Sequence, residues 1–217
     1  MMVILVTGGS GSGKSEFAER LLTLLQKENR IYIATMKPFG EESLERIRRH
    51  QLQRKDRGFT TVERYRDIGK LAAHKTGSGS AKQDEDPEQN ALPPHCGVLL
   101  ECLSNLAANE MFDPENVCEC PEKEGKEDGS ARIRRLCGKI CHDIHDLAVN
   151  TDHLVIVTNE IFSEASDYMG DTVRYQELLG RINQRLGNMA DAVVEVVYGI
   201  PVMLKGGEKL ENVMEQL

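Results

Sequence analysis

The feature that most restricts the fold of this chain is a glycine-rich stretch near its beginning, GGSGSGKS at residues 8–15. The apolar run VILVT at residues 3–7 comes directly before it and is typical of a strand that is covered on both faces. Residues 15–26 follow and repeat apolar side chains at helical spacing. A strand, a glycine-rich loop and a helix in this order predict a loop that binds phosphate groups.

The loop satisfies the pattern G-x-x-x-x-G-K-[ST], and each residue type in it has a physical reason. Glycines let the backbone wrap around a polyphosphate with several N–H groups pointing inward, and the helix adds its positive N-terminal end. We expect Lys14 to reach the β- and γ-phosphates and the Ser15 hydroxyl to ligate Mg²⁺. The alternative is a glycine–serine turn that merely contains a lysine, and the strand and helix around the loop argue against it. The residues predicted to hold the phosphates are Gly8, Gly9, Ser10, Gly11, Ser12, Gly13, Lys14 and Ser15.

Beyond the loop, apolar β-branched runs alternate with amphipathic stretches, which predicts parallel strands joined by helices. The predicted strands cover residues 3–7, 31–35, 60–63, 97–101, 153–158, 192–197 and 202–205. The predicted helices cover residues 15–26, 42–55, 65–73, 102–112, 133–149 and 172–189. We therefore expect an α/β fold: a single P-loop NTPase-like domain over residues 1–217, with a mostly parallel central sheet flanked by helices. Acidic inserts near 75–94 and 113–130 are expected on the surface, the first of them without chemistry.

Charge and composition exclude several classes of protein. The 27 Lys and Arg residues against 35 Asp and Glu give a net charge of −8 at pH 7, which argues against a broad nucleic-acid-binding surface. No apolar run approaches the roughly 20 residues of a membrane span, and the first residues lack the basic start of an export signal. We expect a cytoplasmic protein with no nucleic-acid partner and no membrane span, whose six cysteines are free thiols.

A phosphate-binding loop also needs an acidic group near its metal ion, commonly at the end of a neighbouring strand. Glu101 closes the strand GVLLE and is the candidate, although a strand-end carboxylate that faces solvent is an equal alternative. Asn159 and Glu160 follow HLVIVT, at the kind of strand end where open α/β sheets bind ligands. Helix capping is the alternative role for this pair. The sequence thus predicts Ser15 and Glu101 as the residues at a Mg²⁺ ion.

A basic segment supplies a second candidate for chemistry. Arg46, His50 and Arg54 lie along one face of the helix predicted at residues 42–55. A neutral imidazole can attack phosphorus, and guanidinium groups stabilise the charge that develops on phosphate oxygens. Such a histidine could take up a nucleotidyl group covalently. A solvated helix whose arginines pair with nearby glutamates is the alternative that composition leaves open.

Several sequence blocks together resemble one known family. The blocks VILVTGGSGSGKS, IATMKP, ERIRRHQLQR, LLECLSNLAANEMF, VIVTNE, GRINQRL and ADAVVEVVYGIP occur in this order. They are similar to those of the bifunctional adenosylcobinamide kinase / adenosylcobinamide-phosphate guanylyltransferases of cobalamin biosynthesis. The blocks cover nearly the whole chain except the two acidic inserts. The R-I-x-x-H helix and the G-R-[IV]-N-Q-R-L block make the resemblance specific, which the phosphate loop alone would not.

The resemblance implies two reactions and a set of site residues. Enzymes of this family phosphorylate the aminopropanol hydroxyl of adenosylcobinamide with ATP or GTP, then transfer GMP from GTP to that phosphate and release pyrophosphate. GMP is carried on the histidine that matches His50, so the implied catalytic residues are His50 and Lys14. Residues matching Ala34, Thr35, Glu63 and Glu101 line the nucleotide site in the family. The family assembles as a trimer with its active site near the subunit interface, so we expect a homotrimer that binds a corrinoid substrate.

The chain departs from the family pattern after VIVTNE. The family commonly has a glycine-rich stretch ending in Val-Pro there, whereas residues 161–180 read IFSEASDYMGDTVRYQELLG, so corrinoid contacts are not carried over onto this stretch. Two other functions stay open. One is a kinase for another small alcohol with His50 as a bystander, and the other is a regulatory protein that binds nucleotide without phosphorylating a small molecule.

Overall fold

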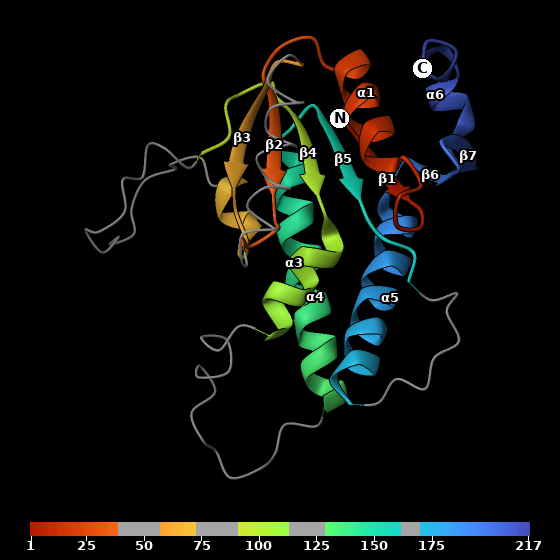
Figure 1. The fold of residues 1–217 in the computed structure, drawn as a ribbon. Helices are drawn as coiled ribbons and strands as arrows, with labels where there is room; N and C mark the ends of the chain where they lie inside the picture. Colours follow the sequence, from red (N-terminus) through yellow and green to blue (C-terminus); the bar gives the residue numbers. More distant parts are fainter. Residues whose placement is uncertain (39–56, 73–90, 113–128, 162–169) are drawn as a thin grey trace.

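The computed structural model describes residues 1–38, 57–72, 91–112, 129–161 and 170–217. In these residues a seven-stranded sheet has the order β3-β2-β4-β5-β1-β6-β7 (Figure 1). The strands are β1 (Met2–Thr7), β2 (Arg30–Ala34), β3 (Phe59–Glu63), β4 (Gly97–Glu101), β5 (His153–Val157), β6 (Ala192–Val197) and β7 (Ile200–Lys205). The helices are α1 (Lys14–Leu25), α3 (Leu103–Phe112), α4 (Gly129–Val149), α5 (Asp171–Met189) and α6 (Gly207–Met214), with a short 3-10 helix η1 (Ile68–Ala72).

The direction of the strands decides where a site can form. Strands β1 to β6 pair in parallel, and β7 alone among the described strands pairs antiparallel, with β6. Parallel strands all end at the same edge of a sheet, so the residues that follow β1, β2, β3, β4 and β5 meet along one carboxyl edge. Ligands of open α/β sheets bind at this edge.

Helices cover both faces of the sheet, which explains why the central strands are continuous apolar runs. One buried cluster joins β-strand side chains to α1 and α6 and includes Phe17, Leu21 and Leu210. The larger cluster lies on the other face, against η1, α3, α4 and α5. It includes the fully buried Ile140 and Ile182. Because helices bury both faces of the sheet, polar side chains gather where the strands end, at the edges of the sheet.

The predicted fold class is confirmed, and each predicted strand has an observed counterpart. The α-helix predicted at 65–73 is wrong for its described part: residues 65–72 contain only the 3-10 helix η1, because Asp67 has a left-handed φ of 49°. The insert predicted at 75–94 is not wholly exposed, since Leu92 is 4% exposed and its N–H bonds to Leu71 O at 3.1 Å. The second insert ends earlier than predicted, because α4 begins at Gly129. Helix α6 was not predicted, and the helix predicted at 42–55 falls outside the described residues.

Candidate active site

The loop after β1 requires glycine at two positions. A side chain on Gly8 would lie 2.5 Å from the Val196 carbonyl oxygen and 2.6 Å from Ser12 Oγ, too close for any other residue. Gly13 has φ +90°, a conformation that L residues rarely adopt, and it directly precedes α1. The turn between β6 and β7 supports the loop from outside, because Gly199 N donates to Ser12 O at 2.8 Å. The loop is therefore held in shape before a ligand binds.

Lys14 is held against this loop. It is the first residue of α1, is 8% exposed, and donates from Nζ to Gly9 O at 3.0 Å. Gly9, Ser10 and Gly11 are exposed. The N–H groups of the first turn of α1 have no helical acceptor of their own and add the positive end of the helix dipole at this point. The loop thus presents an ammonium group and backbone N–H groups to an anion that arrives from solvent.

Ser15 and Glu101 meet although 86 residues separate them in the chain. Ser15 lies in the first turn of α1, Glu101 ends β4, and Ser15 Oγ donates a hydrogen bond to Glu101 Oε1. Glu101 is only partly exposed. Hydroxyl and carboxylate oxygens are ligands that Mg²⁺ prefers, so the donor set fits that ion.

The register of the sheet aligns further residues of the predicted nucleotide site. Ala34 in β2 is the partner of Glu63 in β3 and of Glu101 in β4. Glu101 is in turn the partner of Val157 in β5, which is the partner of Val6 in β1. With about 4.8 Å between neighbouring strands, this row extends about 19 Å from β1 to β3. That length is comparable with an extended nucleoside triphosphate.

Thr35 lies next to this row, but its polar atoms are used within the fold. Its N–H donates to Glu101 O at 3.0 Å, and its Oγ1 donates to Cys102 O at 2.8 Å. Its carbonyl oxygen accepts a hydrogen bond of 2.8 Å from Asn109 Nδ2. Thr35 is fully buried. The side chain therefore ties the end of β2 to the residues after β4, and a direct contact with nucleotide stays a prediction.

Asn159 and Glu160 lie between the loop and Glu101, because β5 lies between β1 and β4. Asn159 Nδ2 donates to Ser104 Oγ at 2.6 Å, and Glu160 N donates to Gly8 O at 3.1 Å. The next described helix, α5, begins after Gly170 without a side-chain cap, so neither residue caps it. Ser104 was not predicted as part of the site, because no local pattern marks a serine inside a helix.

Glu63 has a neighbour that sequence reasoning did not find. Tyr65 OH donates to Glu63 Oε2 at 2.7 Å. Burial and then this hydrogen bond raise the pKa of Tyr65 to about 12. The phenol is therefore protonated at neutral pH and orients the Glu63 carboxylate as a donor.

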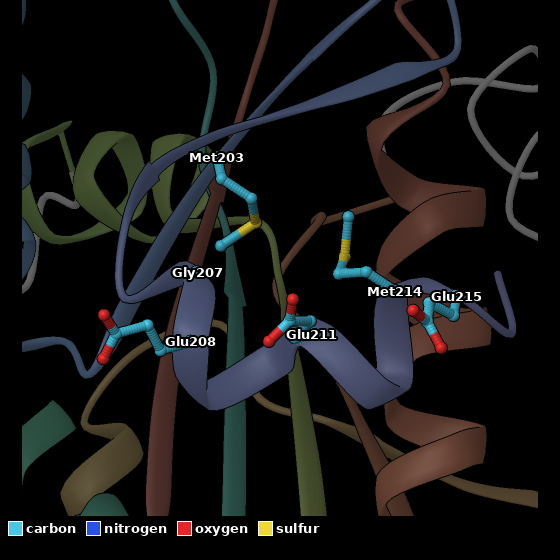
Figure 2. A pocket seen from close by; sticks show the side chains of 6 residues that line it. All are labelled: Met203, Gly207, Glu208, Glu211, Met214 and Glu215. Carbon is cyan, nitrogen blue, oxygen red and sulfur yellow. The ribbon is translucent and has the colours of Figure 1, made fainter.

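A hollow lies away from the loop, between β7 and α6 (Figure 2). Its volume is about 460 Å³, and the side chains that line it are Met203, Met214, Glu208, Glu211 and Glu215, with Gly207. Three carboxyl groups around an apolar floor repel an anionic triphosphate. This hollow is therefore a poor site for a nucleotide, in contrast to the carboxyl edge.

His50 and the arginines around it fall in residues 39–56, outside the described residues. Their role stays a prediction. The described residues contain the phosphate loop, the Ser15–Glu101 pair and the row from Ala34 to Glu63. These features belong to the carboxyl edge of one sheet.

A glycine-rich loop follows the first strand of a mostly parallel sheet, and a lysine begins the next helix beside a serine–carboxylate pair. These features define a P-loop protein that binds nucleotides. The comparison with protein families specifies which one. The chain belongs to the cobinamide kinase / cobinamide phosphate guanyltransferase family, whose sequence profile matches residues 4–204. It is a bifunctional kinase and guanylyltransferase of cobalamin biosynthesis.

Two relatives match over their whole length. The bifunctional adenosylcobalamin biosynthesis protein CobU of Escherichia coli (strain K12) is 30% identical over 205 residues, which cover 94% of this chain and 100% of the relative. The protein of the same description from Salmonella typhimurium (strain LT2) is 29% identical over 210 residues, with the same coverage. The crystal structure of flagellar accessory protein FlaH from Methanocaldococcus jannaschii covers 94% of this chain and 78% of its own, at 13% identity and a TM-score of 0.43. None of the helices in the described ranges combines the length and apolar character that a membrane span requires.

Proposed function

We propose that both reactions use one nucleotide site along the carboxyl edge, with the triphosphate at residues 8–15 and the nucleoside toward Ala34, Thr35 and Glu63. The observation that supports this best is the register row, which aligns Glu63, Ala34 and Glu101 with the strand that carries the loop. ATP or GTP serves as phosphate donor, and GTP serves as GMP donor. The acceptor is the corrinoid substrate, first as an alcohol and then as its phosphate.

We propose that Mg²⁺ joins this site at Ser15 and Glu101. The ion supplies neutralisation of charge on the β- and γ-phosphates. Ser15 Oγ and the Glu101 carboxylate are already in contact, so both ligand types are present at one point. Lys14 exchanges its contact with Gly9 O for phosphate oxygens and adds a second positive charge.

In the kinase reaction the aminopropanol hydroxyl oxygen of adenosylcobinamide attacks the γ-phosphorus. A new O–P bond forms, the bond from the γ-phosphorus to the β–γ bridging oxygen breaks, and the nucleoside diphosphate leaves; the hydroxyl proton passes to solvent. The part of the protein is to hold the reacting groups in line and to stabilise the phosphate charge. Lys14 and the N-terminal turn of α1 are the groups that do this.

In the guanylyltransferase reaction we propose that an imidazole nitrogen of His50 attacks the α-phosphorus of GTP. An N–P bond forms, the α–β anhydride bond breaks, and pyrophosphate leaves. The phosphate oxygen of adenosylcobinamide phosphate then attacks the same phosphorus and releases His50. His50 is 15 residues after Thr35 in the chain, and Thr35 lies at the middle of the carboxyl edge, next to Ala34 and Glu101.

We also propose a homotrimer whose interface includes the turn between β6 and β7. The exposed apolar side chains of this hairpin are Val197, Tyr198, Ile200, Val202 and Leu204. Such a contiguous apolar surface is typical of a protein–protein contact. Gly199 of the same hairpin bonds to the phosphate loop, so a second copy that covered the hairpin would lie beside the active site. Val202→Glu should convert the trimer to monomer in light scattering, and an unchanged trimer would contradict this interface.

A covalent-labelling experiment tests the transferase half. The protein is incubated with α-labelled GTP and Mg²⁺, denatured, and examined for label that is stable to base and labile to acid, as expected for an N–P bond. The adduct should be absent in His50→Ala and retained in His142→Ala, a matched change at an exposed histidine of α4. An adduct that survives in His50→Ala contradicts the assignment.

Phosphorylation of adenosylcobinamide tests the kinase half. Lys14→Ala should lower its rate on the order of 10²-fold, because it removes a charge aimed at the transferred phosphate. His50→Ala should leave this rate nearly unchanged. A kinase for another alcohol would fail with adenosylcobinamide, and a regulatory protein would bind nucleotide but fail in both assays.

A further inference from the structure

Asn109, on the last turns of α3, contacts both segments that carry the predicted nucleoside end of the site. Its Nδ2 donates to Thr35 O at 2.8 Å and to Tyr65 O at 3.1 Å. Both partners are carbonyl oxygens, and within a carboxamide only the NH₂ group can donate to them, so the orientation of the Asn109 carboxamide is fixed. One side chain therefore bridges the exit of β2 and the residues after β3, 74 and 44 positions away in the chain.

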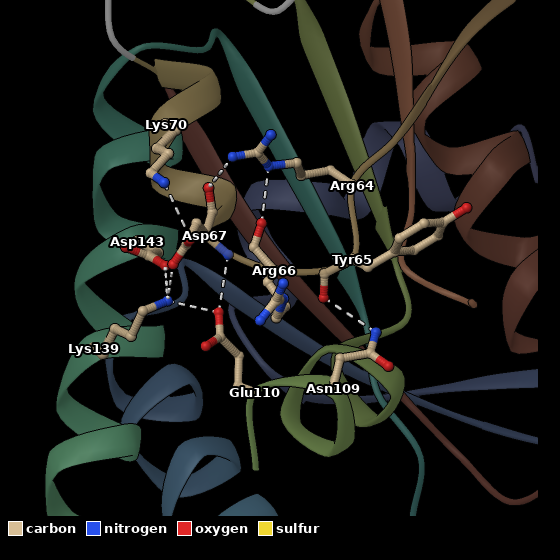
Figure 3. A network of polar contacts seen from close by, with 9 residues as sticks. All are labelled: Arg64, Tyr65, Arg66, Asp67, Lys70, Asn109, Glu110, Lys139 and Asp143. Carbon is tan, nitrogen blue, oxygen red and sulfur yellow. Dashed lines mark hydrogen bonds and ion pairs between the residues drawn. The ribbon is translucent and has the colours of Figure 1, made fainter. Parts of the chain in front are cut away.

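Tyr65 extends this bridge to Glu63. The carbonyl oxygen of Tyr65 accepts from Asn109, and its hydroxyl donates to Glu63 Oε2 at 2.7 Å. Figure 3 shows the Tyr65 ring pointing away from Asn109, on the other side of the backbone from the Lys139 ion pairs. The position of the Glu63 carboxylate thus depends on Tyr65, and the position of Tyr65 depends on Asn109.

The helix that carries Asn109 is itself fixed by an ion-pair network (Figure 3). Glu110, 1% exposed, accepts from Asp67 N at 2.9 Å and pairs with Lys139 Nζ at 2.6 Å. Lys139 Nζ also pairs with Asp67 Oδ1 at 2.7 Å and with Asp143 Oδ2 at 3.1 Å. Three carboxyl groups this close could suggest a cation site, but the ammonium group of Lys139 occupies the space between them. The network therefore anchors α3 to α4 and to the loop before η1.

We propose that Asn109 and Tyr65 are positioning residues of the nucleotide site: they hold Thr35 and Glu63 at a set distance from the phosphate loop. This inference rests on the proposed nucleotide site. Neither residue touches a reacting phosphate in it. Their effect passes through the nucleoside end, so it falls on the affinity for GTP and spares the rate of the chemical step.

The first test is Asn109→Asp, which keeps the shape of the side chain but sets a carboxylate oxygen against two carbonyl oxygens. The Kd for GTP, measured by calorimetry, should rise on the order of tenfold, because both hydrogen bonds of Asn109 are lost and each contributes only a small net free energy. The kcat of phosphorylation at saturating GTP should stay within about twofold, since no transition-state contact is removed. Asn150→Asp is the matched control, because Asn150 Nδ2 donates to one carbonyl, Asp146 O, at the end of α4.

The second test remains informative if Asn109→Asp fails to fold. Tyr65→Phe removes only the hydroxyl, and its effect on the Kd for GTP is measured in the wild type and in a Glu63→Ala background, which has no acceptor for that hydroxyl. A positioning role predicts a several-fold loss in the wild type and no further loss without the Glu63 carboxylate. Equal losses in both backgrounds, or wild-type affinity in Asn109→Asp, would overturn the inference. Lys14→Ala tests the nucleotide site separately. If this change also left the affinity for GTP unaltered, the proposed nucleotide site would be wrong; if it weakened GTP binding, only the positioning role of Asn109 and Tyr65 would be wrong.

Discussion

Replacing Lys139 by methionine should be among the most damaging single changes outside the active site. The ammonium group lies within 2.6–3.1 Å of carboxylate oxygens of Asp67, Glu110 and Asp143. Burial lowers the pKa of Lys139, but the hydrogen bonds to Asp67 and Glu110 outweigh it and raise the pKa above the usual range. Methionine keeps most of the apolar stem and removes the charge. What remains is a group of three neighbouring carboxylates, of which Glu110 is 1% exposed, without the ammonium group of Lys139 between them.

The magnitude follows from that burial. Removing one member of a buried ion pair costs about 3–5 kcal/mol, and Lys139 is one-third exposed, so we expect the lower end, about 3 kcal/mol. For a chain of this length that corresponds to a fall in Tm of about 6–12 °C. Adding Glu110→Gln should restore part of the loss, because the most buried of the three neighbouring carboxylates is then neutral.

Urea denaturation of the wild type, the two single variants and the double variant measures this coupling. The reasoning requires a coupling free energy of at least about 1.5 kcal/mol in the double-mutant cycle. A loss below about 1 kcal/mol in Lys139→Met, or additive effects of the two changes, would show that the network is solvated and does not anchor α3.

Three further predictions concern the loop, the metal pair and the contact between Asp191 and β1. Gly13→Ala should cost about 1–2 kcal/mol of stability and weaken GTP binding, because the φ of Gly13 is +90° and the new Cβ would lie 3.3 Å from Gly199 Cα. The control is Gly187→Ala in α5, where the space around the new Cβ is open. This variant should be neutral or stabilising in thermal melts. Glu101→Gln should lower the rate of Mg²⁺-dependent phosphorylation on the order of 10²-fold, while GTP should still bind in the absence of Mg²⁺. Equal activity of the wild type and Glu101→Gln would contradict the role of Glu101 as a Mg²⁺ ligand. Hydrogen bonds from Lys209 and from Val3 N lower the pKa of Asp191. The ionised Asp191 side chain therefore stabilises the fold above the pKa that it has in the unfolded chain, and this stabilisation is lost as the pH falls through its pKa in the folded protein. The stability difference between wild type and Asp191→Asn should therefore shrink in acid, and a difference that is constant between about pH 7 and 2 would refute this.

The elements that sequence reasoning found are those with a strong local pattern. The loop at residues 8–15 and the apolar strands carry their signal within a few consecutive residues, and the register then follows from parallel pairing. Glu101 was a candidate because it ends such a strand and because it matches a site residue of the family, but its contact with Ser15 requires the fold.

The elements that were missed depend on distant contacts or are too short to show a long helical pattern. Asn109 lies in a helix that looks ordinary, and its partner Thr35 is 74 residues away. Helix α6 is only eight residues long, so the apolar side chains at helical spacing, Leu210, Val213 and Met214, extend over little more than one turn. The helix predicted at 65–73 fails because Asp67 adopts a left-handed φ and its N–H is taken by Glu110. Tertiary contacts there outweigh local helix propensity.

The most direct test of the central claim is a crystal structure of the protein with GTP and Mg²⁺. The account predicts the β- and γ-phosphates in the loop at residues 8–15, Mg²⁺ at Ser15 and Glu101, the nucleoside beside Ala34 and Glu63, and the α-phosphorus within bonding reach of the His50 imidazole. A triphosphate that pointed away from this loop, or a nucleoside that left the carboxyl edge toward β6 and β7, would contradict it.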